Sequence, residues 1–144
     1  MENTDDLIVV ISELIREQFP NVSFSLENDN LMVIEQELKN GFKIIIAQGE
    51  IENTLYLGSW HMHFEKDIDG KNELVDYLHF GMSRLGRVKA FARKGKEYKW
   101  VFETKNIEDG LWYPVGTMGL INLKFWQKTQ IEYYQNDFIP LEQN

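Results

Sequence analysis

Apolar residues recur at intervals of three and four positions over the first twenty residues of the chain. This spacing predicts an amphipathic helix that runs to about Phe19 and ends before Pro20. Thr4 or Asp5 is the expected N-cap, because either side chain can accept a hydrogen bond from the first turn. The apolar face of this helix consists of Leu7, Ile8, Ile11, Leu14, Ile15 and Phe19.

Beyond Pro20, apolar residues alternate with polar ones, which is the pattern of strands with one buried face. Three short strands are predicted over residues 22–26, 31–36 and 42–48, with turns at ENDN and KNG between them. A fourth strand is predicted over residues 54–64, which end in the segment WHMHF. These strands are expected to follow one another along the chain without an intervening helix.

Residues 71–86, with the sequence KNELVDYLHFGMSRLG, return to helical spacing and predict the second helix. Gly86 is the expected terminator, because glycine is common just after the last turn of a helix. The apolar stripe of this helix consists of Val75, Leu78, Met82 and Leu85.

The next segment, RVKAFARKGKEYKWVFE at residues 87–103, predicts a hairpin whose register follows from its side chains. A loop with an odd number of residues centred near Gly95 places small residues opposite large ones on one face and arginine opposite glutamate on the other. A loop with an even number would mix the two faces. The predicted pairs are Val88 with Phe102, Ala90 with Trp100, Ala92 with Tyr98, Arg87 with Glu103, and Arg93 with Glu97.

After a turn at NIEDG, residues 120–126 and 130–134 predict a last hairpin across QKTQ. Trp112, Tyr113 and Pro114 lie between the turn and this hairpin, in a predicted loop. Isolated aromatic residues are mostly buried, so the loop is expected to fold back onto the core; if exposed, its aromatics would suit a partner.

The predicted fold class is α+β, as a single domain over residues 1–144. It has two helices and six to eight strands in the order α-ββββ-α-ββββ. Because the loops between neighbouring strands are too short for parallel crossovers, the sheet is expected to be mainly antiparallel.

The composition fits one globular domain and limits the chemistry. Hydrophobic residues make up 43% of the chain and aromatic residues 13%, which is enough for a substantial core. The chain has no cysteine, so disulfides, thiolate metal sites and thiol nucleophiles are excluded. The first twenty residues are acidic and hold a continuous apolar run of only residues 7–11, which predicts neither a signal peptide nor a membrane span. A cytoplasmic location is expected.

Charge is distributed unevenly along the chain, whose formal net charge is −8. Residues 1–80 hold 16 Asp and Glu against five Lys and Arg, for −11, whereas residues 81–144 hold seven against ten, for +3. An acidic protein repels nucleic acid and suits a basic partner, although an acidic surface can also serve solubility alone.

The segment WHMHFE raises the possibility of a metal site. Residues two apart share a face of a strand, so His61, His63 and Glu65 are predicted to point one way and Trp60, Met62 and Phe64 the other. Two imidazoles so placed can share a zinc ion, with His79 or an acid from elsewhere completing the site. Glu65 lies about 13 Å along the strand from His61 and cannot easily contribute. Histidines that only pack and form hydrogen bonds are the alternative.

The following segment, EKDIDGKNELVD, has the spacing of a calcium-binding loop. The residues at positions 1, 3, 5, 6, 9 and 12 of such a loop are Glu65, Asp67, Asp69, Gly70, Glu73 and Asp76. The segment departs from the pattern in the glutamate at position 1, the polar Asn72 at position 8 and the short aspartate at position 12. The alternative is an acidic turn that starts a helix, where acids interact favourably with the helix dipole.

Other catalytic and binding motifs are not matched. GMSRLG differs from the nucleophile elbow by one residue and lies in the second predicted helix. No P-loop or dinucleotide-binding glycine motif is present. The basic residues between Arg84 and Lys99 alternate with aromatics as in nucleic-acid surfaces, but the predicted hairpin register assigns Tyr98 and Trp100 to the core and pairs two arginines with glutamates. A solvated edge hairpin is the favoured interpretation.

Taken together, GSWHMHFE, the helix ELVDYLHFGMSRL and the basic hairpin resemble small bacterial proteins of the polymorphic or contact-dependent toxin immunity type. The resemblance covers about residues 58–104, and its distinctive motif is Trp60-His61-x-His63-Phe64. It implies a protein that binds a cognate toxin, and it transfers no site residues because such families bind through surfaces that vary.

Two functions are favoured, and a subunit or regulator of a larger assembly, with an exposed aromatic patch or self-association, is a third possibility. The first is a non-enzymatic acidic inhibitor of a basic protein toxin, without a cofactor, a membrane or a nucleic-acid partner. Its candidate contacts are Glu50, Glu52, Glu65, Asp67, Asp69 and Glu73. The second is a metal-binding protein or metal-dependent hydrolase that uses zinc or calcium, with His61, His63 and His79 as candidate ligands.

Overall fold

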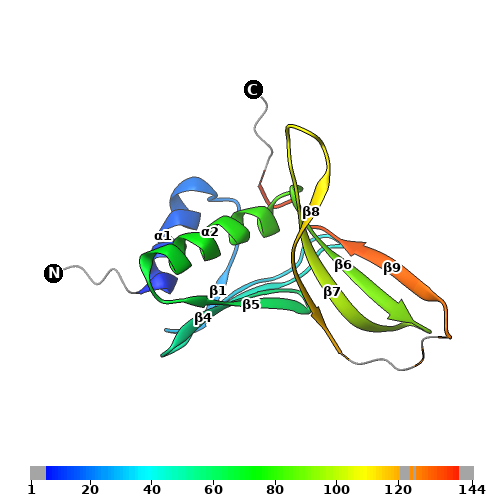
Figure 1. Cartoon of the computed structure of the whole chain (residues 1–144). Helices are drawn as coiled ribbons and strands as arrows, with labels where there is room; N and C mark the ends of the chain where they lie inside the picture. The colour runs from blue at the N-terminus through cyan, green and yellow to red at the C-terminus, as the bar shows by residue number, and fades with distance from the viewer. Residues whose placement is uncertain (1–5, 121–123, 125, 140–144) are drawn as a thin grey trace.

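The computed structural model describes residues 6–120, 124 and 126–139, and this part of the chain forms two helices and nine strands (Figure 1). All strand pairs are antiparallel, which confirms the predicted α+β class. The strands form two sheets, however, of five and four strands. The elements are α1 (Leu7–Gln18), β1 (Ser25–Asn28), β2 (Leu31–Ile34), β3 (Ile44–Gln48), β4 (Glu52–Leu57), β5 (Trp60–Glu65), α2 (Ile68–Met82), β6 (Gly86–Arg93), β7 (Lys96–Lys105), β8 (Trp112–Gly119) and β9 (Thr129–Tyr134).

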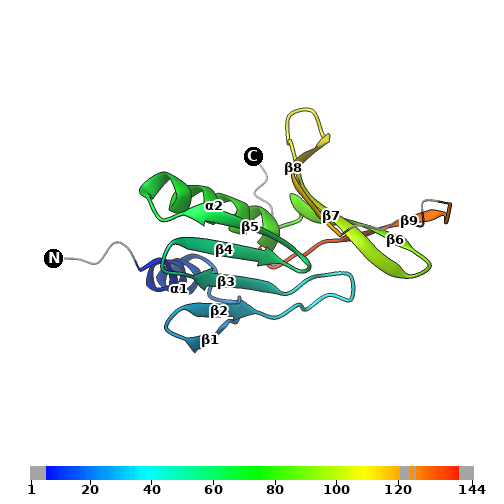
Figure 2. The ribbon, with the colours of Figure 1, turned by 60° about the horizontal axis from the view of Figure 1, so that its bottom comes forward.

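The first sheet is a meander in the order β1-β2-β3-β4-β5, and both helices pack on one of its faces (Figures 1 and 2). Alternate residues of the strands supply the buried side of this layer, as their period of two predicts. They pack against Leu7, Ile11 and Ile15 of α1 and against Leu74, Leu78 and Met82 of α2. The buried strand residues are Met32, Ile34, Ile44, Ile46, Leu55, Leu57, Trp60 and Phe64.

Both helices differ from prediction at their ends. The N-cap of α1 is Asp6, whose side chain accepts a hydrogen bond from Val9 N at 3.2 Å, while Thr4 and Asp5 lie outside the described residues. The second helix begins at Ile68 rather than residue 71, because Asp67 caps it. It ends at Met82, since Ser83 is extended, and the predicted terminator Gly86 begins β6 instead.

The single strand predicted over residues 54–64 is wrong. The structure has a hairpin there, in which β4 and β5 are joined by the two-residue turn Gly58-Ser59 and Leu57 pairs with Trp60. Gly58 has φ +61°, a conformation that favours glycine. The buried positions shift from odd numbers, Leu55 and Leu57, to even numbers, Trp60 and Phe64, at this turn. A single continuous strand would have kept one phase, so this shift is the signal that separates the two strands.

The second sheet has the order β8-β7-β6-β9, so the last predicted hairpin is also wrong (Figure 2). Strand β9 pairs with β6, and residues 121–123 and 125 of the predicted partner segment lie outside the described residues. The predicted loop at Trp112–Gly119 is instead the edge strand β8, with Tyr113 and Pro114 exposed. Proline is tolerated on an edge strand, and here it lies beside a register shift opposite β7.

The predicted register of the β6–β7 hairpin is confirmed for the three pairs far from the turn and wrong near it. Val88 pairs with Phe102, Ala90 with Trp100 and Arg87 with Glu103. The turn itself has two residues, Lys94 and Gly95, both with positive φ. A β-bulge at Tyr98 reconciles an even turn with the odd register, so that Ala92 faces Glu97 and Arg93 faces Lys96.

One continuous hydrophobic core runs through both sheets. Side-chain hydrogen bonds from the buried Asn136 also tie the two parts together, because its amide bonds the backbone of Phe42 before β3 and of Gly81 in α2. Among the described residues, neither helix is long and apolar enough to cross a membrane.

Candidate functional site

Strand β5, which holds His61 and His63, has the two faces that the sequence predicts. Trp60 and Phe64 of β5 are buried under the helices, whereas His61 and His63 lie on the opposite face of the first sheet. The two imidazole rings are neighbours, with centroids 5.3 Å apart in an edge-on arrangement. The ring of His61 also packs against Tyr56 on β4, at 5.2 Å.

His63 has polar partners in its own sheet. Its Nδ1 lies 2.9 Å from Thr54 Oγ1 on β4 and also contacts the carboxylate of Glu52. His79 is not brought to this pair, because it lies on α2, on the other side of the sheet, with its ring 5.8 Å from that of Phe19. Over the ranges that the structure describes, no group of three His, Cys, Asp or Glu side chains is placed to hold a metal ion.

The candidate calcium segment is mostly helical. Residues 68–76 belong to α2, so their side chains project in different directions around the helix axis instead of converging. The Asp67 carboxylate accepts a hydrogen bond from Gly70 N at 2.7 Å and thus caps the helix. This arrangement is the acidic helix start that was the alternative to a calcium loop.

The six candidate acidic contacts lie near one another at one end of the first sheet. Glu52 and Glu65 are directly opposite across β4 and β5, and Glu50 lies in the turn just before β4. Asp67 and Asp69 follow β5 at the beginning of α2, and Glu73 lies one turn further along it. We call this surface, with Ile51 and Ile68 between its acids, the acidic end.

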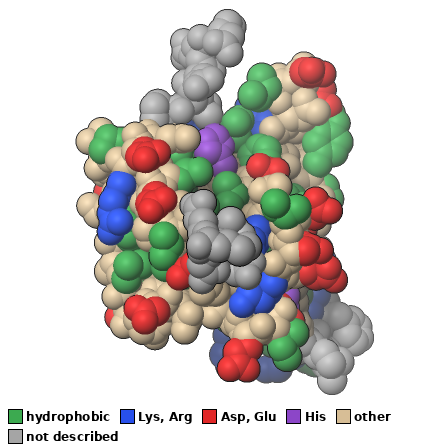
Figure 3. Space-filling model, turned by 90° about the vertical axis from the view of Figure 1, so that its left-hand side faces the viewer, with side chains coloured by type: hydrophobic (Ala, Val, Ile, Leu, Met, Phe, Trp, Pro, Cys, Tyr) green, Lys and Arg blue, Asp and Glu red, His purple; other side chains and the backbone are tan. Residues whose placement is uncertain are grey.

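Two large apolar side chains are exposed within the acidic end. Ile51 is 87% exposed and Ile68 is 75% exposed, although isoleucine is one of the most often buried residue types. A shallow depression of about 410 Å³ lies beside Ile51 and is lined by Glu52, His63 and Asp67 among others. Figure 3 faces this side of the molecule and shows Asp and Glu side chains spread widely over it.

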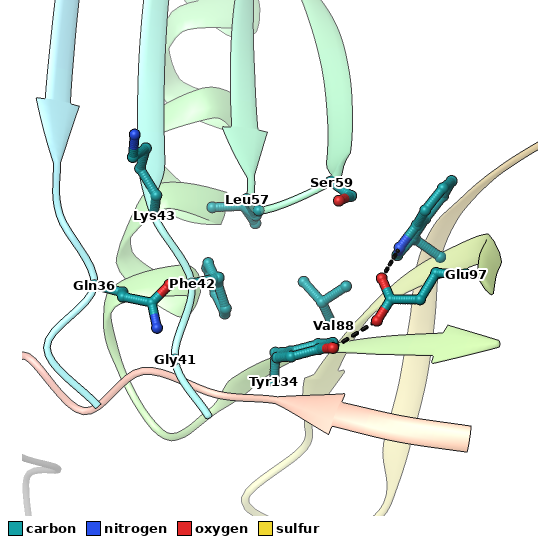
Figure 4. Close-up of a pocket in the computed structure, with 11 residues that line it drawn as sticks. Gln36, Gly41, Phe42, Lys43, Leu57, Ser59, Val88, Glu97 and Tyr134 are labelled. Carbon is teal, nitrogen blue, oxygen red and sulfur yellow. Dashed lines mark hydrogen bonds between the residues drawn. The ribbon is translucent and has the colours of Figure 1, made fainter. Parts of the chain in front are cut away.

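A second hollow lies where the two sheets meet, and it has a volume of about 320 Å³ (Figure 4). We call it the inter-sheet cleft. One carboxylate, that of Glu97, lines it between Trp100 and Tyr134. Sequence reasoning missed this site because the predicted register turned Glu97 to the opposite face, toward Arg93. The signal that could have found it is the two-residue turn Lys94-Gly95. An even turn agrees with the pairing of small and large residues farther along the hairpin only if one strand has an extra residue between them.

The basic residues of the hairpin occupy the other face of the second sheet. Arg87 lies between the rings of Trp112 and Tyr133, 4.1 Å from each centroid, and donates to Glu103 at 2.7 Å. Trp100 is buried as predicted, but Tyr98 is not directed to the core and instead packs against Arg93, whose guanidinium carbon lies 4.6 Å from the ring centroid.

No protein-family model matches the chain, and comparisons with curated proteins and with solved structures found no match.

Proposed function

We propose that this chain is a non-enzymatic binding protein of the cytoplasm, an immunity-type inhibitor that binds a basic protein toxin through the acidic end. The observation that carries the proposal is the exposure of Ile51 and Ile68 beside the six acids of the acidic end. An exposed apolar side chain is ordinary by itself, but two of them within one charged surface resemble the centre and rim of a protein interface.

In the acidic end, the apolar and the charged side chains would contribute to binding in different ways. The isoleucines would be the apolar anchors that lose water on contact, and such central residues contribute most of the affinity. The surrounding carboxylates would accelerate encounter with a basic surface and exclude acidic partners. Because the acids lie on strand ends, a turn and the first turns of α2, the backbone under them is fixed before binding.

The test begins with matched baits in an extract of the source cells. Wild-type protein and the Ile51→Ser/Ile68→Ser variant are immobilised side by side, and proteins held only by the wild type are identified. Serine at these exposed positions leaves the fold almost unchanged, with an expected effect on stability of about 0.5 kcal/mol or less. A basic toxin that wild-type protein holds and inhibits, with affinity at least about tenfold weaker for the variant, would support the proposal.

Kinetics provide the second measurement. Association with the purified toxin should slow steeply between low and physiological salt, and Glu52→Gln/Glu65→Gln should slow it further at low salt. Lys94→Gln/Lys96→Gln, at the β6–β7 turn of the second sheet and the first residue of β7, is the matched control and should leave association unchanged or faster. A salt-independent association rate, or equal binding by the serine variant, would refute the acidic end as the interface.

A further inference from the structure

The inter-sheet cleft is separate from the acidic end. The two lie at opposite ends of the β4–β5 hairpin, which the cleft meets at its turn, Gly58-Ser59, and the acidic end at Glu52 and Glu65. Five residues of strand separate them, or about 17 Å. A ligand in the cleft therefore engages different residues from a protein bound at the acidic end, and its binding is independent of the proposed function.

Several distant parts of the chain form the cleft. Gln36 follows β2, Phe42 precedes β3, and Ser59 lies in the β4–β5 turn, whereas Val88, Glu97 and Tyr134 come from the second sheet (Figure 4). A volume of about 320 Å³ is at the small end of the range for ligand pockets. It suits a small molecule or one long side chain of a partner.

The β-bulge at Tyr98 is what directs Glu97 into this cleft. Without the extra residue, Glu97 would face Arg93 on the basic side of the sheet, as the regular register predicts. With it, Glu97 faces the small Ala92, and Tyr98 turns outward to Arg93. Bulges commonly re-aim a side chain beside a functional site, and here the side chain that changes face is a carboxylate.

The carboxylate is held by two neutral donors. Trp100 Nε1 donates to Oε1 at 2.9 Å, and the Tyr134 hydroxyl donates to Oε2 at 2.5 Å. The hydrogen bond to Glu97, together with burial, raises the pKa of Tyr134 to about 12, so this donor keeps its proton at physiological pH. A carboxylate has about four acceptor positions, and these donors occupy two of them.

No cation within the described residues forms an ion pair with Glu97. Lys43 lines the mouth of the cleft, but its ammonium group points away from Glu97 in Figure 4 and lies 3.7 Å from Glu35. The walls around the carboxylate are apolar or aromatic, since Phe42 and Val88 are buried there. The cleft thus presents one fixed negative charge between ring systems.

We propose that the inter-sheet cleft binds a guanidinium group, with Glu97 as its counter-ion. Guanidinium is planar and weakly hydrated, stacks on aromatic rings and forms paired hydrogen bonds to carboxylates, so it fits this combination better than an ammonium ion does. Trp100 and Tyr134 orient the carboxylate, and Gln36 and Ser59 at the mouth offer polar contacts to the remainder of the ligand. The guanidinium comes from a free metabolite or from an arginine side chain of a partner.

The probes are agmatine, acetyl-Gly-Arg-Gly-amide and the matching peptide with citrulline, which has the shape of arginine without its charge. Each is titrated into the full-length protein while the indole N–H resonance of Trp100 is followed by NMR and assigned with Trp100→Phe. Saturable shifts with both guanidinium probes, or with one, and at least about tenfold weaker binding of the citrulline peptide are expected. Tighter binding of agmatine identifies a free ligand as the source, and tighter binding of the arginine peptide identifies a protein side chain.

Two variants locate the binding. Glu97→Gln keeps the shape and removes the charge, and it should abolish the discrimination between arginine and citrulline, whereas the matched control Glu108→Gln in the exposed β7–β8 turn should not. If Glu97→Gln does not fold, Ser59→Trp tests the proposal instead. The tryptophan obstructs the mouth of the cleft from an exposed position and leaves the Glu97 hydrogen bonds intact, so it should weaken binding of the guanidinium probes. Equal binding of the arginine and citrulline peptides by the wild-type protein, or unchanged binding by the folded variants, overturns the proposal.

Discussion

Trp60 and Phe102 pack their rings with centroids 4.9 Å apart, and this contact joins the two sheets. Trp60 begins β5 of the first sheet, and Phe102 lies in β7 of the second. Trp60 Nε1 also donates to the carbonyl of Gly116 on β8 at 3.1 Å. Gly116 lies directly against the indole, because a Cβ there would be 3.5 Å from it, at ordinary van der Waals distance.

Removing the Trp60 side chain, which contacts Phe102 and Gly116, should destabilise the whole domain. Trp60 is fully buried, so Trp60→Ala leaves a large cavity between the sheets and should cost about 3–5 kcal/mol of unfolding free energy. Trp60→Phe keeps a ring beside Phe102 but loses the hydrogen bond to Gly116, which adds about 1 kcal/mol to a smaller packing loss. Urea unfolding followed by circular dichroism measures both changes. A Trp60→Ala variant whose stability stays close to that of wild type would show that the sheets are joined elsewhere.

Gly70, in the first turn of α2, should resist replacement although alanine is the better helix former. A Cβ at this position would overlap the carbonyl oxygen of Glu65, and the backbone would have to move. Helix propensity alone predicts that Gly70→Ala stabilises the protein by about 1 kcal/mol. We expect the opposite sign, a loss of about 1–3 kcal/mol in urea unfolding, because overpacking against the backbone dominates. Asn72→Ala, exposed in the same helix, is the control and should stabilise slightly.

The stability of the second sheet should depend on Arg87. From β6 its side chain reaches all three other strands, through Glu103 on β7, Trp112 on β8 and Tyr133 on β9. Arg87→Ala leaves Glu103, which is only slightly exposed, without its cation and should cost about 2–3 kcal/mol. Arg87→Lys should restore no more than half of this, because an ammonium group cannot stack on both rings and bond the carboxylate.

Thermal unfolding of the two Arg87 variants, with Lys105→Ala as a control from the same sheet, provides the measurement. If Arg87→Lys has the full stability of the wild-type protein, charge alone matters at this position.

Regular periodicity was enough to predict the fold class, both helices and the buried face of β5. Leu78 and Met82 were found because helical spacing reports a buried stripe directly. The pattern failed at a short turn between two apolar strands and in a strand rich in glycine. Apolar residues on both sides of Gly58-Ser59 made two strands resemble one, although the buried positions change there from odd to even numbers. The glycines and proline of β8 conceal an edge strand.

The binding surfaces were predictable to different degrees. The acids of the acidic end are close in sequence or joined by a hairpin, so local reasoning named them. Glu97 was assigned to the wrong face because the extra residue, Tyr98, inverts the strand residues on its turn side relative to those beyond it. Its partner Tyr134 lies on β9, and the pairing of β9 with β6 is set by tertiary packing rather than by local pattern.

The Glu97–Tyr134 hydrogen bond should be visible as a late tyrosine titration. Tyr134 has a folded-state pKa of about 12 against an ordinary value of 10.0, because its hydroxyl donates a hydrogen bond to the Glu97 carboxylate and is partly buried. Since the folded pKa is raised, the associated stability is fully present below pH 10 and is lost as the pH rises toward 12. Solvent screening at this partly exposed group limits the contribution to about 1 kcal/mol.

The absorbance of tyrosinate, recorded against pH for wild-type protein and Tyr134→Phe, isolates this residue by difference. Glu97→Gln should move the Tyr134 midpoint back toward 10.0, since the negative charge that holds the proton is gone. Glu132→Gln, the acid two residues before it, should lower the midpoint much less, because its influence is the smallest of the four causes. If Tyr134 titrates near 10.0 in folded wild-type protein, Glu97 is not oriented by it, and the cleft does not hold its carboxylate in place before a ligand binds.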